Sequence, residues 1–145
     1  MKIALKYVTV MFLAALPMTG ASAQDAVLDV TPGNYKISRE TTSSDTAEPI
    51  VNNEERCIRD KVFNPVSALP QNRGCTAKNV KKSGNTVTFD ITCTGGAEMP
   101  PMTGKAEYSS NGMAIGWNIE FKVDVEGKTL TIVNKAEGKR VGDCK

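Results

Sequence analysis

The sequence feature that most limits the fold is a long alternation of apolar and polar residues toward the C-terminus. Apolar side chains occupy every second position of this stretch: Met113, Ile115, Trp117, Ile119, Phe121, Val123 and Val125. Successive side chains of a β-strand point to opposite faces, so the pattern predicts a strand with one apolar and one mainly polar face. A helix would spread the same apolar residues around its surface. The stretch therefore predicts a sheet that buries one face.

A turn sequence before this strand predicts an antiparallel hairpin. Asn111-Gly112 favours a two-residue turn of type I′. Such a turn would place Tyr108 opposite Ile115 and Ala106 opposite Trp117, with all four side chains on one face.

A second turn after the strand extends the pattern. A two-residue loop at Glu126-Gly127 would place Leu130 opposite Val123 and Ile132 opposite Phe121. Both turns keep the apolar side chains of the paired strands on one face. A slip of one residue in either pairing would move the apolar side chains of one strand to the opposite face. The sequence therefore predicts a three-stranded antiparallel meander.

Upstream residues predict further strands with weaker patterns. Pro32-Gly33 precedes a strand in which Tyr35 and Ile37 alternate with polar residues. The polar stretch 41–48 is typical of a loop, and residues 50–58 resemble a polar edge strand.

One short helical turn is expected between residues 64 and 69. Asn64 is a suitable N-terminal cap, and Pro65 fits the first helical position. Residues 70–74 are expected to form a loop.

The hairpin around Gly84-Asn85 admits two registers. A two-residue turn would place Val80 opposite Phe89 but leave Cys75 and Cys93 on opposite faces. A symmetric three-residue turn would pair the two cysteines and turn Val80 outward. We expect Cys75 to pair with Cys93, with a β-bulge that returns Val80 to the core.

These segments predict an all-β fold, an antiparallel meander of about seven strands that forms a small barrel or sandwich. Strand order is not encoded in turn sequences, so the sequence leaves open whether the sheet closes. Residues 24–145 are expected to form a single disulfide-stabilised domain.

The first 23 residues resemble a secretory signal peptide. Lys2 and Lys6 precede a mainly apolar run, and Ala21-Ser22-Ala23 fits the cleavage pattern. The run is shorter than the roughly 20 residues that a membrane-spanning helix needs. We expect cleavage near Ala23, a periplasmic or secreted protein, and no membrane span.

The cysteine content agrees with export. An exported chain meets oxidising conditions, and an even number of cysteines is typical of structural disulfides. With Cys75 and Cys93 paired, the second disulfide would join Cys57 to Cys144. The cysteines lack the close C-x-x-C spacing of most zinc and redox sites.

Charge and composition exclude several functions. The chain has 18 basic and 16 acidic residues, and loss of Lys2 and Lys6 would balance them. A neutral chain lacks the basic field that nucleic-acid binding usually needs. The sequence contains no histidine, which excludes Ser-His-Asp catalysis and removes the commonest metal ligand.

No cofactor or metal is expected. Met99, Met102 and Met113 could in principle hold Cu(I), but Met102 falls on the predicted core face, where methionine commonly fills space.

Aromatic residues supply the candidate ligand-binding set. Five aromatic residues could line a pocket for a small apolar ligand: Tyr35, Phe89, Tyr108, Trp117 and Phe121. Four of them, Tyr35, Phe89, Trp117 and Phe121, are the first candidates because they share the expected inner faces. Alternatively, these rings simply fill the core. An interior cavity that opens to solvent would favour the ligand pocket over the filled core.

The mature chain resembles the family of exported bacterial proteins labelled domain of unknown function 3617. The resemblance rests on four segments: Pro32-Gly33-Asn34-Tyr35, Cys57 after a polar strand, the segment from Cys75 to Cys93, and Gly138-Lys139-Arg140-Val141-Gly142-Asp143-Cys144. Tyr35 stands where relatives more often have tryptophan. The resemblance implies an exported, cysteine-bridged β protein and implies no activity.

The sequence thus favours a non-catalytic β-domain that binds a small apolar ligand or an envelope protein. The alternative is a purely structural or envelope-stress protein with a fully packed interior. A carboxylate-dependent enzyme comes third, with candidates only by residue type: Glu54, Glu55, Glu107, Glu120, Asp124 and Glu137.

Overall fold

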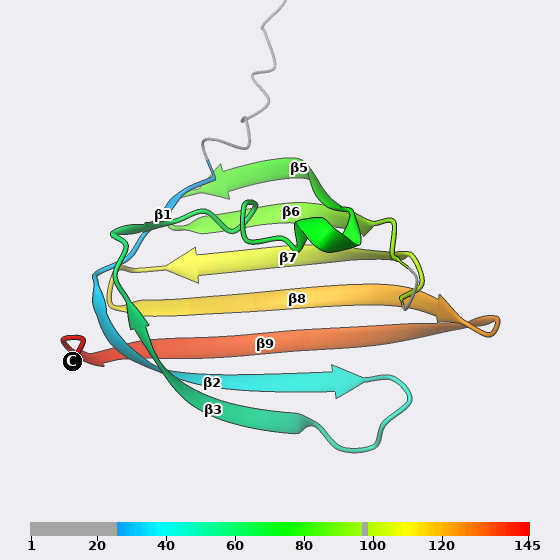
Figure 1. Cartoon of the computed structure of the whole chain (residues 1–145), viewed down its shortest axis with the longest axis horizontal. Coiled ribbons are helices and arrows are strands. Elements are labelled where there is room, and N and C mark those ends of the chain that lie inside the picture. The colour runs from blue at the N-terminus through cyan, green and yellow to red at the C-terminus, as the bar shows by residue number, and fades with distance from the viewer. Residues whose placement is uncertain (1–25, 97–98) are drawn as a thin grey trace, which may run out of the picture.

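One antiparallel sheet dominates the computed structural model, which describes residues 26–96 and 99–145. Within these residues seven strands pair in the order β3-β2-β9-β8-β7-β6-β5 (Figure 1). They are β2 (Gly33–Ser43), β3 (Ile50–Ile58), β5 (Cys75–Ser83), β6 (Thr86–Cys93), β7 (Met102–Ser110), β8 (Ala114–Val125) and β9 (Lys128–Gly142). The predicted all-β antiparallel class is confirmed, whereas the predicted signal peptide lies outside the described residues.

The sheet remains open, and β3 and β5 are its two edges. The closed-barrel alternative is therefore wrong for the described part of the chain. The prediction of a polar edge strand at residues 50–58 is confirmed, because β3 has these bounds and is almost wholly exposed. Its charged residues are typical of edges that do not pair with other chains.

Strands β5 to β9 follow each other as a meander, and the N-terminal strands complete the sheet. β2 pairs antiparallel with β9, so that Arg39 lies opposite Ala136 and Ile37 opposite Gly138. This pairing joins the two ends of the domain and brings β3 to the far edge.

The predicted register is confirmed on one side of β8 and wrong on the other. Between β8 and β9, Val123 pairs with Leu130 and Phe121 with Ile132, as expected. Between β7 and β8, however, Tyr108 pairs with Trp117 and not with Ile115.

The side chain of Asn111 explains the shifted register. Its Oδ1 accepts hydrogen bonds from the backbone N–H groups of Met113, at 3.1 Å, and Ala114, at 2.7 Å. These bonds stabilise a turn over residues 111–114, longer than the two-residue turn predicted from Asn111-Gly112. The shift is two residues, so every side chain keeps its predicted face.

The hairpin of β5 and β6 combines the two registers that the sequence left open. Cys75 pairs with Cys93, and the register shifts between Lys78 and Lys81. Asn79 adopts a positive φ of 53° within this bulge. Val80 lies within the same bulge and packs against the core, as expected.

Three local predictions need correction. The predicted loop at 41–48 is shorter, because β9 supplies partners to β2 as far as Ser43. Asn64 does cap, since its Oδ1 accepts from the N–H groups of Val66 and Ser67, but only a turn follows. The 3₁₀ helix, η2 (Gln71–Arg73), lies instead within the predicted loop at 70–74. Across residues 26–96 and 99–145, no helix combines the length and hydropathy needed to span a bilayer.

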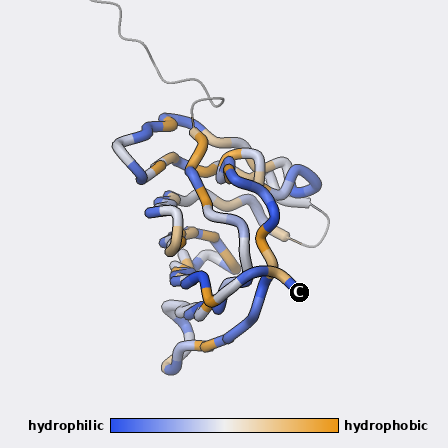
Figure 2. The backbone as a smooth tube through the Cα atoms, turned by 90° about the vertical axis from the view of Figure 1, so that its left-hand side faces the viewer, coloured by the Kyte–Doolittle hydropathy of each residue, from blue (hydrophilic) through white to orange (hydrophobic). Residues whose placement is uncertain are grey.

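A second layer covers part of one face of the sheet. Residues 26–32 and 59–74, which we call the cover, contain the ribbon of β1 (Leu28–Asp29) with β4 (Val62–Phe63), and η2. The cover lies in front of β6 and β7 in Figure 1 and to the right of the sheet in Figure 2. The sheet face against it is called the inner face.

The core beneath the cover is divided into two clusters. The larger one packs Leu28 and Leu69 of the cover against β5, β6 and β7, with Phe89 and Ile91 at its centre. The smaller one comprises Val30, Tyr35, Ile37 and Ala136. The candidate site lies between them.

Candidate ligand-binding site

A cavity of about 650 Å³ lies between the cover and the inner face of the sheet and opens to solvent. This volume is within the range of about 300–1,000 Å³ that is typical of small-molecule sites. Its apolar lining comes from three sources, namely the sheet, the cover and the end of β3: Ile37, Tyr108, Ile115, Trp117, Leu28, Val30, Val62, Phe63, Ala68 and Ile58.

Trp117 forms part of the cavity floor, and polar contacts fix its ring. Its indole Nε1–H donates a hydrogen bond of 2.7 Å to Asn134 Oδ1, and Asn134 Nδ2 donates in turn to Thr41 Oγ1 at 2.8 Å. The guanidinium of Arg39 lies 5.5 Å from the centroid of the ring, within cation–π distance. The polar edge of the indole is thus satisfied by protein, while part of the ring lines the cavity.

Tyr108 continues the floor beside Trp117. The two residues are opposite each other on β7 and β8, with ring centroids 6.3 Å apart. The ring of Tyr108 also stacks on Phe89 of the larger core cluster, at 6.0 Å and an interplanar angle of 6°. Burial raises the pKa of the Tyr108 hydroxyl above its ordinary value, so this residue stays protonated further into the alkaline range than a free tyrosine.

The cover supplies one wall through Phe63. Its ring centroid is 5.8 Å from that of Tyr108, and the residue remains 37% exposed. Phe63 is therefore an apolar wall residue at the boundary between the cavity and solvent.

The end of β3 supplies another part of the wall, which is fixed covalently. Cys57 forms a disulfide with Cys144 that links residues 87 positions apart. Cys57 lines the cavity together with its neighbours Arg56 and Ile58, and with Arg59 and Asp60 where the cover begins. The second disulfide joins Cys75 to Cys93 within the larger core cluster. Both disulfides thus join the pairs expected from the sequence.

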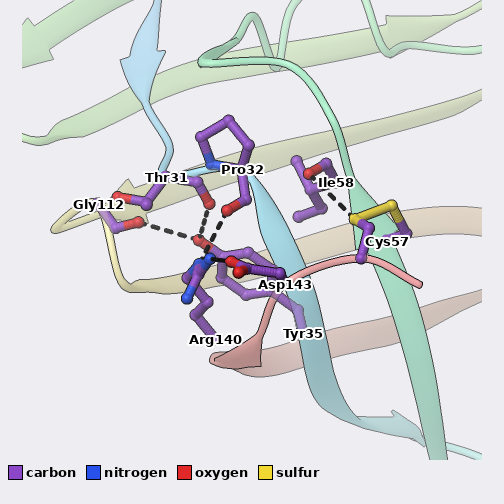
Figure 3. Close-up of polar contacts among 9 residues, drawn as sticks. Thr31, Pro32, Tyr35, Cys57, Ile58, Gly112, Arg140 and Asp143 are labelled. Atoms are coloured by element: carbon purple, nitrogen blue, oxygen red, sulfur yellow. Dashed lines mark hydrogen bonds and ion pairs between the residues drawn. A yellow bond between two sulfur atoms is a disulfide. The ribbon is translucent and has the colours of Figure 1, made fainter.

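A cluster of hydrogen bonds anchors the cover at the end of the sheet (Figure 3). The hydroxyl of Tyr35 shares its single proton between the carbonyl oxygens of Thr31, at 2.8 Å, and Gly112, at 2.9 Å. Arg140 Nε donates to the carbonyl oxygen of Pro32 at 2.8 Å, and its guanidinium also pairs with Asp143. Burial raises the pKa of Tyr35, an effect that Arg140 and the bond to Thr31 partly offset. These contacts hold the chain between β1 and β2 against β9.

The structure separates the four aromatic residues named from the sequence. Trp117 lines the cavity. Tyr35 is fully buried and acts as an anchor, and Phe89 is 3% exposed within the larger core cluster. Phe121 packs against the same cluster farther along β8, outside the cavity lining.

Other lining residues were not among the four. Tyr108, Ile115 and Ile37 share the inner face with Trp117, so the alternation pattern contained the information needed to find them. No sequence pattern indicated Phe63 or Arg59, because their position depends on how the cover folds back over the sheet.

The described residues bring no metal cluster together. Within residues 26–96 and 99–145, no group of three or more histidine, cysteine, aspartate or glutamate side chains could hold an ion. Met102 packs against the core and Met113 is 53% exposed, so these two methionines do not share a site. Among the acidic residues, Asp60 lines the cavity.

Comparison with known proteins gives a family. Residues 30–144 match the family described as "Protein of unknown function (DUF3617)". No curated protein and no solved structure matches the chain. The matched range contains all seven strands of the sheet, both disulfides and nearly all of the cavity lining. The chain therefore belongs to the DUF3617 family of proteins of unknown function.

Proposed function

We propose that this protein is an exported, non-catalytic binding domain that holds a small apolar ligand between the cover and the sheet. The single observation that carries the proposal is the cavity of about 650 Å³ with an aromatic floor. Trp117, Tyr108 and Phe63 offer large apolar surfaces to a ligand, and burial of apolar area is the main source of affinity for such molecules.

The divided core supports this proposal over a purely structural role. A domain selected only for stability gains from one continuous core, because an unfilled cavity forfeits van der Waals contacts. Here the two core clusters are joined only by half-buried residues such as Trp117, Tyr108 and Ile115, and these residues also border the open cavity.

A periplasmic or secreted location is part of the proposal. The fold contains two disulfides, and all four cysteines are paired. Such bonds persist in oxidising compartments and are rare in a reducing cytoplasm. The signal-peptide pattern of the first 23 residues supports the same location.

Fluorescence titration tests the binding proposal directly. Trp117 is the only tryptophan of the chain, so its emission reports on the cavity floor alone. We expect the neutral amphiphile dodecanol, kept below its solubility limit, to shift this emission and to raise the melting temperature.

A wall variant shows whether the probe occupies the cavity. Phe63→Ser should weaken dodecanol binding by about tenfold, because a ligand loses an apolar wall. Val141→Ser is the matched control, since Val141 is 51% exposed and outside the cavity lining. Equal weakening by both variants would reject the cavity as the site, and so would a native protein whose spectrum and melting temperature neither dodecanol nor dodecanoate changes.

A further inference from the structure

We propose that the ligand is anionic: an amphiphile whose alkyl chain enters the apolar cavity and whose carboxylate or phosphate head binds Arg56 and Arg59. This inference rests on the proposed function and adds the chemical class of the ligand. Its basis is the unequal distribution of charge around the cavity.

The cavity has an apolar floor and a cationic wall. Ile37, Ile115 and Trp117 form an apolar surface on β2 and β8, with Gly138 of β9 between the two isoleucines, whereas Arg56 at the end of β3 and Arg59 at the start of the cover add positive charge to the lining. An apolar tail and a charged head would thus find complementary surfaces within one site. Amphipathic ligands bind where these two surfaces adjoin.

The two guanidinium groups are available for a ligand. The neighbouring carboxylates of β3 are already engaged, because Glu54 pairs with Arg39 at 3.1 Å and Glu55 with Lys36 at 3.5 Å. Among the described residues, neither Arg56 nor Arg59 forms an ion pair with a carboxylate.

The cavity lining therefore carries a net positive charge. Asp60 is its acidic residue, set against the two arginines. Arginine presents planar N–H donors that match both oxygens of a carboxylate or phosphate, and a charged hydrogen bond is roughly twice as strong as a neutral one.

The Cys57–Cys144 disulfide holds this cationic wall in place. Arg56 precedes Cys57 directly, and the disulfide ties the end of the exposed edge strand to the C-terminal segment after β9. Edge strands otherwise fray easily because they are paired on one side only. A fixed wall reduces the entropy that a headgroup would lose on binding.

Matched amphiphiles test the inference. Dodecanoate, dodecanol and dodecyltrimethylammonium share one alkyl chain and differ in head charge, and Trp117 fluorescence reports all three. At low ionic strength we expect dodecanoate to bind about tenfold more tightly than dodecanol, and the ammonium compound to bind most weakly. Added salt should narrow the difference, because exposed charges are screened.

Arginine variants identify the groups responsible. The double variant Arg56→Gln/Arg59→Gln should lose about tenfold in dodecanoate affinity while binding dodecanol as before. Arg56→Lys/Arg59→Lys should retain most of the preference, because the charge remains. Arg73→Gln is the matched control, as Arg73 is exposed on η2 and does not line the cavity.

The outcomes separate the two proposals. Equal binding of dodecanoate and dodecanol, or an unchanged preference in the double glutamine variant, would overturn the anionic class while leaving the cavity as an apolar site. Failure of all three amphiphiles to bind would reject the proposed function together with this inference.

Discussion

The indole nitrogen of Trp117 and the amide oxygen of Asn134 are joined by a hydrogen bond of 2.7 Å between neighbouring strands β8 and β9. This bond satisfies the polar edge of a half-buried ring and sets its orientation on the cavity floor. A binding surface on a central strand keeps its shape better than one on a loop, because strand pairing on both sides restricts its motion.

Replacement of Asn134 by alanine should disturb the ring without unfolding the domain. The variant loses the hydrogen bond to Trp117, which should cost about 1 kcal/mol of unfolding free energy. Water should replace the amide and shift the fluorescence of Trp117 to longer wavelength. Asn118→Ala is the control, because Asn118 is exposed on the opposite face of β8. An identical emission spectrum in both variants would contradict the assigned role of Asn134.

The two disulfides should contribute unequally to stability. Loss of the Cys57–Cys144 bond frees a span of 87 residues, whereas loss of Cys75–Cys93 frees 18. Chain entropy predicts costs of about 4.5 and about 3 kcal/mol respectively, measured by denaturant unfolding of the paired cysteine-to-alanine variants.

The same two disulfide variants should differ in their affinity for dodecanoate. Loss of Cys57–Cys144 should also weaken dodecanoate binding, because Arg56 and Ile58 flank Cys57 in the cavity wall. Loss of Cys75–Cys93 should leave the affinity of the folded protein unchanged. If the variant without Cys75–Cys93 bound dodecanoate more weakly than the variant without Cys57–Cys144, the end of β3 would not form the binding wall.

Alkaline pH should destabilise the protein through its buried tyrosines. The pKa values of Tyr35 and Tyr108 lie above the ordinary 10.0 in the folded state, mainly because of burial. The resulting stabilisation is complete below pH 10 and is lost as the pH rises through the folded-state values. Denaturant unfolding from about pH 8 to about pH 11 should therefore show a decline in unfolding free energy.

Phenylalanine variants test the origin of this decline. Tyr35→Phe should lower stability at neutral pH by about 1 to 2 kcal/mol, since two carbonyl contacts lose their donor. It should also make the alkaline decline shallower, because one titrating group is gone. A decline of equal steepness in the Tyr35→Phe/Tyr108→Phe double variant would assign the pH dependence to other groups.

A methyl group added at Gly138 should displace two side chains of the cavity floor. A Cβ at this position would lie 2.8 Å from Cγ1 of Ile115 and 3.1 Å from Cγ1 of Ile37. Both side chains line the cavity, so Gly138→Ala should cost about 1–3 kcal/mol by overpacking and should alter dodecanol affinity. The exposed Gly96→Ala serves as the control. Unchanged stability and affinity in Gly138→Ala would contradict this packing.

The candidate site was predictable only in part. The alternation around Trp117 placed it on a buried face together with Tyr108 and Ile115, because the period of a strand fixes the face of each side chain. The same argument also selected Phe89 and Phe121, which share that face but fill the core. The alternation gives the face of a residue. It does not show whether the residue's position along the strand borders a cavity or the packed core.

The sequence by itself determined the strands of the main sheet, the face of each side chain and some of the local pairings, among them that of β8 with β9. Each depends on residues close together in the chain, as in the turn at Glu126-Gly127 and the bulge that returns Val80 to the core. Only the tertiary structure decided that β2 pairs with β9, that the sheet stays open and that the cover leaves a cavity beside Trp117. These features require contacts between segments far apart in sequence, whose energies depend on the packing of the whole chain and not on any local pattern.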